Sequence, residues 1–254
     1  MKKLIAKTIR KFGYTISRID DVASGFPDMK EKEFWDIYNL CKPYTMTSVE
    51  RMYALYTTVN YILQHGIPGC FVECGVWRGG CAMLIAKMLS NRNITDRPVY
   101  LFDTFEGMSE PTDADRSFKD ESAADLLERS VEDKENSVWC LADLADVKRN
   151  LERTGLPANL LFYIKGKVED TIPKQLPGQA IALLRLDTDW YESTRHELNF
   201  LFPLVVRNGV LIIDDYGHWE GCRKAVDEYF RENNFPVLLY RIDYTGRMAI
   251  KNFG

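Results

Sequence analysis

Short apolar runs that alternate with helical segments constrain the fold of this chain more than any other feature. Five of them read as buried strands, namely "CFVEC", "PVYLFD", "ANLLFYIKG", "AIALLRLD" and "GVLIID". Helical stretches lie between or after them, in "CAMLIAKML", "CLADLADVKRNLERTG", "YESTRHELNFLFPLVV" and "WEGCRKAVDEYFREN". Nearly continuous apolar strands joined through helices are typical of a parallel sheet that is covered on both faces.

The two ends of the chain extend this pattern. Residues 32–65 read mostly as helix, and near the end of the chain "FPVLLYRI" and "RMAIKNF" flank "DYTG" in the pattern of a hairpin. We therefore predict an α/β fold: a doubly wound, Rossmann-like, seven-stranded and mostly parallel sheet with one antiparallel edge strand, plus N-terminal helices. Residues 31–254 are expected to form this domain, and residues 1–30 a basic arm or helix.

Composition narrows the class of protein. With 254 residues, of which 46% are apolar, the chain can bury a large core in one domain. Its 33 basic and 37 acidic residues nearly cancel, so nucleic acid is not an expected partner. The six cysteines form no CxxC pair and no zinc-type cluster with histidine, which favours a reducing cytoplasm.

The basic arm and one long insertion each allow two interpretations. The arm begins "MKKLIAKTIRKFGYTISRI", without an acid and without the apolar core of a signal peptide. It is either a helix in peripheral contact with a membrane or a solvated, dimer-contacting segment, and its shortness favours the second. The insertion at about residues 104–139 is polar and long for a connection. It is either a mobile lid over a pocket or a surface excursion with its own helix near residues 123–130.

Acidic residues end four of the predicted strands, at Glu73, Asp103, Asp187 and Asp214. A buried carboxylate is costly unless it is paired or bound to a metal ion. In doubly wound sheets ligands bind beyond the carboxyl ends of the strands, where the strand order reverses. We therefore expect these acids to meet at one rim of the sheet and to form a site.

A glycine turn follows the first strand, where "VECGVWRGG" places Gly75, Gly79 and Gly80 before a helix. Glycines there allow a ligand to approach the backbone, although they also suit a tight turn without a ligand. The spacing matches neither the dinucleotide fingerprint nor a phosphate-binding P-loop. Asp103 is placed for a ribose diol and Glu73 for a cationic amino group. S-adenosylmethionine carries both groups.

Two aspartate pairs follow the fourth and fifth strands. Asp187 and Asp189 flank Thr188, and Asp214 precedes Asp215. Carboxylates so close repel each other unless a cation is present. Oxygen ligands without histidine or cysteine suit Mg²⁺ or Ca²⁺ better than zinc, and Mg²⁺ suits a catalytic role. The alternative is that these aspartates only cap the helices that follow.

Six stretches together resemble the macrocin O-methyltransferase family over residues 44–230: "YTMTSVERMYAL", "HGIPGCFVECGVWRGG", "LFDTFEGM", "KGKVEDTIP", "LDTDWYEST" and "GVLIIDDYGHWEGCRKAVDEY". The resemblance implies a class I enzyme that methylates a sugar or related hydroxyl of a bacterial secondary metabolite or glycan, with S-adenosylmethionine and Mg²⁺ as cofactors. The acceptor would be a small molecule or a glycan, and the family's habit of association implies a homo-oligomer.

The resemblance also implies roles for individual residues. The metal ligands would be Asp187, Asp214 and Asp215, and the catalytic base would be Asp189. The cofactor-binding positions would be Glu73, Gly75 and Asp103, with Tyr44, Thr45 and Met46 at the methionine end and Gly79 and Gly80 in the same turn. Thr188 stands where the best-known members have glycine, a departure that implies a narrower pocket on the side of the methyl acceptor.

Three questions stay open at the level of sequence. His218 is a rival base, since the unperturbed imidazole pKa suits proton transfer near neutral pH. Arg185 lies inside an apolar strand, where pairing with a rim acid would account for it. Two other functions also remain, a nicotinamide-dependent sugar oxidoreductase, which the glycine spacing disfavours, and a non-catalytic S-adenosylmethionine-binding module.

Overall fold

The computed structural model describes residues 22–135, 137–172, 174–176 and 179–253, so most of the predicted basic arm lies outside the described residues. The chain divides into two compact units, residues 1–36 and 37–254. In the first unit the 3₁₀ turn η1 (Val22–Gly25) precedes the start of α2 (Lys32–Cys41). Within it, the Trp35 indole donates a hydrogen bond to the Met29 carbonyl at 2.7 Å.

The second unit is built on one seven-stranded sheet with the strand order β3-β2-β1-β4-β5-β7-β6. The strands are β1 (Cys70–Cys74), β2 (Val99–Asp103), β3 (Leu161–Lys165), β4 (Ile181–Leu186), β5 (Val205–Ile213), β6 (Tyr240–Arg241) and β7 (Arg247–Ile250). Strands β1 to β5 are parallel, and β7 runs antiparallel to both β5 and β6. The predicted doubly wound sheet is therefore confirmed, with the antiparallel strand second from the edge and the short β6 outermost.

Except for α7 (Val168–Thr171), which was not predicted, the helices match the predicted segments closely. They are α3 (Val49–Gln64), α4 (Gly80–Asn91), α5 (Ala123–Arg129), α6 (Leu144–Glu152), α7, α8 (Tyr191–Leu201) and α9 (Glu220–Glu232), with 3₁₀ turns η2 (Lys42–Tyr44), η3 (Ala158–Leu160) and η4 (Phe202–Leu204). One prediction was wrong: the helix expected to continue through Val206 ends at Leu201. Pro203 lacks the N–H that a further helical turn requires, so the chain forms η4 and enters β5 at Val205.

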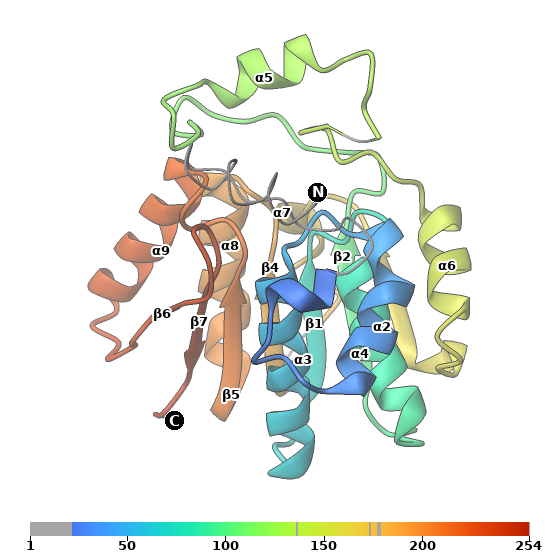
Figure 1. Ribbon diagram of the computed structural model, residues 1–254. Helices are drawn as coiled ribbons and strands as arrows, with labels where there is room; N and C mark the ends of the chain where they lie inside the picture. Colours follow the sequence, from blue (N-terminus) through green and yellow to red (C-terminus); the bar gives the residue numbers. More distant parts are fainter. Residues whose placement is uncertain (1–21, 136, 173, 177–178, 254) are drawn as a thin grey trace, which may run out of the picture. The chain divides into compact units, whose positions relative to one another are not determined.

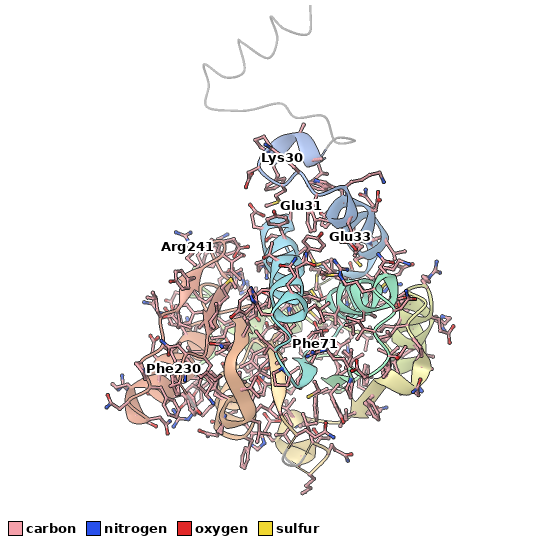
Figure 2. All side chains as sticks on the ribbon, turned by 90° about the horizontal axis from the view of Figure 1, so that it is seen from below. Lys30, Glu31, Glu33, Phe71, Phe230 and Arg241 are labelled. Carbon is pink, nitrogen blue, oxygen red and sulfur yellow. The ribbon has the colours of Figure 1, made fainter. Side chains whose placement is uncertain are left out.

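Both faces of the sheet are covered by helices, as the apolar strands predicted. On one face, Val72 and Leu184 belong to the same buried cluster as Leu198 of α8 and Val226 of α9. Helices α3 and α4 lie on the opposite face in Figure 1. Phe71 on β1 is fully buried, and Figure 2 shows it among the interior side chains. Burial on both faces explains why these strands lack the polar alternation of a one-sided sheet.

The insertion after β2 lies beyond the carboxyl ends of the strands, with α5 at its outermost point (Figure 1). Its backbone is tied to the domain: the Phe118 N–H donates to the His218 carbonyl at 2.8 Å. The Trp190 indole, at the start of α8, donates to the Ser109 carbonyl at 3.0 Å. The helix expected near residues 123–130 is present as α5, and the segment around it contacts the rim.

Two remaining expectations concern cysteines and membranes. All six cysteines are free thiols, and five are buried. Burial raises the pKa of Cys74 and Cys81, so these thiols pack as small apolar groups. Among the described residues no helix is both long and apolar enough to cross a membrane.

Candidate active site

The carboxyl ends of β1, β2, β4 and β5 surround a cavity of about 400 Å³. Its wall is completed by residues 44–47, by the insertion and by the loop between β6 and β7. The cavity is lined by eleven of the residues predicted to bind the cofactor or metal or, for Asp189, to act as the base: Tyr44, Thr45, Met46, Glu73, Gly75, Gly80, Asp103, Asp187, Asp189, Asp214 and Asp215. Gly79 does not line it and instead forms the N-cap of α4 in the left-handed conformation, with φ of 90°.

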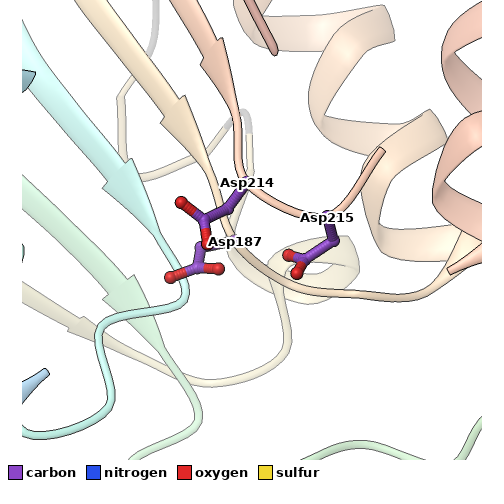
Figure 3. A group of neighbouring side chains, drawn as sticks. All are labelled: Asp187, Asp214 and Asp215. Carbon is purple, nitrogen blue, oxygen red and sulfur yellow. The ribbon is translucent and has the colours of Figure 1, made fainter. Parts of the chain in front are cut away.

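Three aspartates form a compact cluster at the rim, shown in Figure 3. Asp187 follows β4, Asp214 and Asp215 follow the neighbouring β5, and one oxygen from each lies within 4.8 Å of the others. The Oδ2 atom of Asp215 is buried and has no hydrogen-bond partner among the described residues. Burial raises the pKa of Asp215 well above its usual range, and the negative charge of Asp189 raises it further. This oxygen-only set with an unpaired buried atom fits a hard divalent cation such as Mg²⁺.

Arg185 connects the acids of three neighbouring strand ends. Its Nη1 donates to Glu73 Oε1 and to Asp187 Oδ2, both at 2.7 Å, and its Nη2 donates to Asp214 Oδ1 at 2.6 Å. The side chain is only 2% exposed. These ion pairs account for a charged residue inside β4. Arg185 pairs with the rim acids and fixes their spacing.

A second arginine, Arg51 of α3, reaches the same cluster. Its Nη1 donates to Asp214 Oδ2, and its Nε donates to Asp243 Oδ2 at 3.0 Å. Neither Arg51 nor Asp243 was predicted from the sequence. The two pairs join residues 163 and 192 positions apart, so no local spacing connects them. Tyr244, beside Asp243, also lines the cavity without having been predicted.

Both predicted bases face the cavity. Asp189 has a φ of 66°, a left-handed conformation that aspartate tolerates better than most residues. Burial raises the pKa of Asp189 to about 7. His218 lies on the loop after β5, with Nδ1 at 3.1 Å from the Tyr244 hydroxyl. Burial lowers the pKa of His218, and the Arg51 charge adds to this effect.

The glycine turn is shaped by close contacts within the chain. A Cβ added to Gly75, whose φ is 79°, would lie 1.9 Å from the Asp187 carbonyl oxygen. A Cβ on Gly80 would lie 2.5 Å from Thr45 Cβ. The absence of a side chain at Gly75 therefore allows the end of β1 to lie against the end of β4. At Gly80 it allows the segment before α3 to cross the start of α4. Both glycines also line the cavity.

Asp103 and Glu73 occupy two different environments in the cavity wall. The Asp103 carboxylate accepts backbone hydrogen bonds from Val76 and Phe105 at 2.6 Å and from Trp77 at 3.1 Å, so it also holds the glycine turn. Burial nevertheless raises the pKa of Asp103. Glu73 Oε1 is paired with Arg185, whereas Oε2 is buried without a partner in the described chain. Burial raises the pKa of Glu73 to about 8.

Thr188 has a role that differs from the expected one. Its hydroxyl donates to the carboxyl oxygens of Glu197 in α8, at 3.0 and 3.2 Å. Thr188 does not line the main cavity, whereas its neighbours Asp187 and Asp189 do. The threonine therefore anchors the loop that carries these two aspartates rather than narrowing the acceptor side.

The sheet is Rossmann-like, and the cavity lies at the rim where the strand order reverses between β1 and β4. An O-methyltransferase from Bacillus cereus solved in complex with SAH shares this fold, with a TM-score of 0.53 and 13% identity over 92% of this chain and 97% of that one. Residues 28–250 match the macrocin O-methyltransferase (TylF) family, and the chain belongs to that family.

Named relatives agree with this assignment. The chain is 34% identical over 203 residues to an 8-demethyl-8-(2,3-dimethoxy-α-L-rhamnosyl)-tetracenomycin-C 4'-O-methyltransferase of Streptomyces olivaceus, covering 80% of this chain and 74% of that one. It is 32% identical to the mycinamicin III 3''-O-methyltransferase of Micromonospora griseorubida, covering 80% and 76%. The solved O-methyltransferase NovP is 31% identical with a TM-score of 0.70, covering 83% of each chain. This chain is therefore an O-methyltransferase.

Proposed function

We propose that this enzyme transfers the methyl group of S-adenosylmethionine to a hydroxyl of a sugar or glycosylated natural product, with Mg²⁺ bound at the aspartate cluster. The observation that carries the proposal is the cluster itself, three carboxylates within 4.8 Å beside a cavity of about 400 Å³. The names of the relatives support the acceptor class, since two of them act on a glycosylated tetracenomycin and on mycinamicin III.

The cofactor would occupy the part of the cavity beside β1 and β2. Glu73 Oε2 is an unpaired buried oxygen that can accept a hydrogen bond from the ammonium group of the methionine moiety. Asp103 can accept hydrogen bonds from a ribose diol while it keeps its backbone donors. The backbone of Gly75 and Gly80, with Thr45 and Met46, would enclose the methionine end.

The residues that would hold the metal are Asp187, Asp214 and Asp215. When bound, Mg²⁺ would act as a Lewis acid that lowers the pKa of a nearby hydroxyl. Arg185 keeps two of these carboxylates in place through hydrogen bonds at 2.7 and 2.6 Å. Such preorganisation matters because sub-ångström errors in ligand placement weaken both binding and catalysis.

Asp189 is the proposed base. The acceptor oxygen forms a bond to the methyl carbon as the carbon–sulfur bond breaks, and the hydroxyl proton passes to Asp189. The products are the methyl ether and S-adenosylhomocysteine. Asp189 lies in the cavity wall next to the cluster, and its left-handed backbone turns it back toward Asp215. His218 is the second candidate for this role, because it lines the same cavity.

The two other functions from the sequence are not favoured. Neither a nicotinamide-dependent oxidoreductase nor an idle binding module accounts for a chain that matches O-methyltransferases across residues 28–250. A cytoplasmic location, a homo-oligomeric state and peripheral membrane contact through the basic arm remain predictions.

The proposal is tested by removing the base, a metal ligand or the metal. We expect Asp189→Asn to lower turnover by about 10²- to 10⁴-fold, the range for loss of a positioned acid–base group. Asp214→Asn should also lower turnover, because it removes a proposed metal ligand. EDTA should abolish methyl transfer and Mg²⁺ should restore it. Turnover is measured with radiolabelled S-adenosylmethionine and glycosylated acceptors.

The matched control is Asp170→Asn, an exposed aspartate on α7 whose removal should leave turnover unchanged. Calorimetric titration of S-adenosylhomocysteine shows whether each variant remains folded. Full activity in EDTA would refute the role of the metal, and full activity of Asp189→Asn would leave His218 as the base.

A further inference from the structure

Three aromatic side chains meet beside the cavity: His218 after β5 and Tyr244 between β6 and β7, which line it, and Phe118 of the insertion, which contacts both of them. We call them the mouth cluster. Ring centroids lie 5.3 Å apart for Phe118 and His218 and 5.9 Å apart for Phe118 and Tyr244. Phe118 is 54% exposed and Tyr244 is 52% exposed. Large exposed rings in contact, at the edge of a functional cavity, indicate a binding surface.

The cluster is continuous with the proposed reaction site. His218 and Tyr244 both line the cavity that contains Asp187, Asp214 and Asp189. A molecule that rests on the rings can therefore extend a polar group toward the aspartates.

Three chain segments are joined to present these rings. The Phe118 N–H donates to the His218 carbonyl at 2.8 Å. A Cβ on Gly217 would lie 2.0 Å from the Tyr244 carbonyl oxygen, so a glycine is needed for the two loops to approach. The Gly217 N–H donates to the Thr245 carbonyl at 2.9 Å. The rings are thus held by backbone contacts, which limits the entropy lost when a ligand binds.

The geometry of the rings selects the chemistry of the ligand. Their planes meet at 59°, 61° and 68°, so no two of them form the parallel slot that a planar polycyclic ligand would fill. Polar atoms lie within the cluster, since His218 Nδ1 is 3.1 Å from the Tyr244 hydroxyl. A pyranose ring matches this arrangement, because it has a C–H face that packs on the negative face of an aromatic ring and hydroxyls around its edge.

We propose that the mouth cluster binds the sugar ring of the methyl acceptor and directs one of its hydroxyls toward the aspartates. This inference rests on the proposed function and adds the residues that recognise the acceptor. Tyr244 and His218 contribute hydrogen-bonding groups at the ring edge, and Phe118 contributes an apolar face. Removal of one ring should weaken acceptor binding without affecting the cofactor, because Glu73 and Asp103 lie on β1 and β2, whereas the rings lie after β5, between β6 and β7 and in the insertion.

The binding test uses saturation-transfer NMR with methyl α-L-rhamnopyranoside, on enzyme loaded with S-adenosylhomocysteine and Mg²⁺. The wild type should transfer saturation to the ring C–H protons of the sugar, and Phe118→Ala and Tyr244→Ala should lose most of the signal. Phe200→Ala is the control, since Phe200 is a 41% exposed aromatic on α8 that does not line the cavity. Absence of transfer in the wild type, or equal transfer in all variants, would overturn the proposal. So would preferential binding of 2-naphthol, a planar aromatic, at the same rings.

The kinetic test separates recognition from folding and from the proposed reaction. With a glycosylated acceptor that the wild type methylates, Phe118→Ala should raise KM about tenfold with little change in kcat, and Phe118→Tyr should restore it. The affinity for S-adenosylhomocysteine should stay unchanged, which excludes misfolding. An unchanged KM in Phe118→Ala overturns the mouth cluster while leaving methyl transfer intact. Failure of the wild type to methylate any acceptor would instead count against the proposed function.

Discussion

At the scale of single residues, the site is a set of mostly buried carboxyls of which only some are paired with a cation. Arg185 pairs with Glu73, Asp187 and Asp214, whereas Asp215 retains an unpaired oxygen. Glu197 lies beneath them, fully buried, and accepts a hydrogen bond from Thr188. Burial raises the pKa of Glu197 well above the usual carboxyl value, which favours the protonated form of this group in the folded enzyme.

Glu197 makes stability depend on pH. The folded-state pKa lies above the unfolded value, so as pH rises past the unfolded value the unfolded chain releases a proton that the folded chain keeps. Stability is therefore lost with rising pH, by at most about 1.4 kcal/mol per pH unit. Glu197→Gln removes this titration and retains a similar shape. We expect its free energy of unfolding to exceed that of the wild type at pH 8, with a gap that narrows toward pH 5.

Denaturant unfolding at several pH values measures this gap. Glu192→Gln, at an exposed position on the same helix, provides the control and should follow the wild type. A difference between Glu197→Gln and the wild type that is the same at every pH would show that Glu197 is ionised in the folded state.

At the scale of elements, the insertion is the segment whose role the sequence left most open. Met108, Ser137 and Val138 from it line the cavity, and Phe118 belongs to the mouth cluster. The Asp115 side chain accepts a hydrogen bond from the backbone N–H of Tyr191, the first residue of α8, at 2.7 Å. These contacts place the insertion in the cavity wall, which is the position that a lid requires.

A lid over the cavity predicts protection by ligands. We expect trypsin to cleave within residues 104–139 several-fold more slowly when S-adenosylhomocysteine and Mg²⁺ are both present, because ligands that bridge the insertion and the rim lower the population of the open state. Mass spectrometry of the fragments reports the cleavage sites. The same cleavage rate with and without ligands would favour a surface excursion that is independent of the site.

At the scale of the whole domain, the strand order brings distant residues to one rim. Arg51 bridges Asp214, which follows β5, and Asp243, which precedes β7. It therefore links α3 to the loop after β5 and to the loop between β6 and β7. Its side chain is 12% exposed, and it supplies positive charge to a cluster of acids. Its charge stabilises the cluster most when no divalent cation is bound, since either cation offsets the same repulsion.

Removal of the Arg51 side chain should therefore lower the stability of the protein mainly when no metal ion is bound. We expect Arg51→Met to lower the free energy of unfolding in EDTA by about 3 kcal/mol, the scale for breaking a buried ion pair. Saturating Mg²⁺ should recover part of the loss, whereas Arg51→Lys should lose less in EDTA because it keeps the charge. Thermal unfolding with and without Mg²⁺ compares the three proteins. An equal loss under both conditions would show that Arg51 contributes packing and not charge compensation.

Much of this arrangement follows from local sequence patterns. The apolar runs at "CFVEC" and "AIALLRLD" predicted β1 and β4, because a strand covered on both faces needs apolar side chains at successive positions. The acids that follow such runs predicted Asp187 and Asp214 at one rim, since parallel strands end on the same side. These predictions could be made from the sequence alone, because each depends only on residues that are neighbours within one strand or directly after it.

Only the tertiary structure decided the partners of these residues. Arg185 is an anomaly in an apolar strand until β1 and β5 place Glu73 and Asp214 on either side of it. Gly75 and Gly80 serve contacts with Asp187 and Thr45, which lie far away in the chain. Arg51, Asp243 and the mouth cluster carry no local signal, because their contacts join segments that only the folded sheet brings together. A sequence determines which groups a strand or helix presents, whereas the packing of strands and loops determines which groups meet.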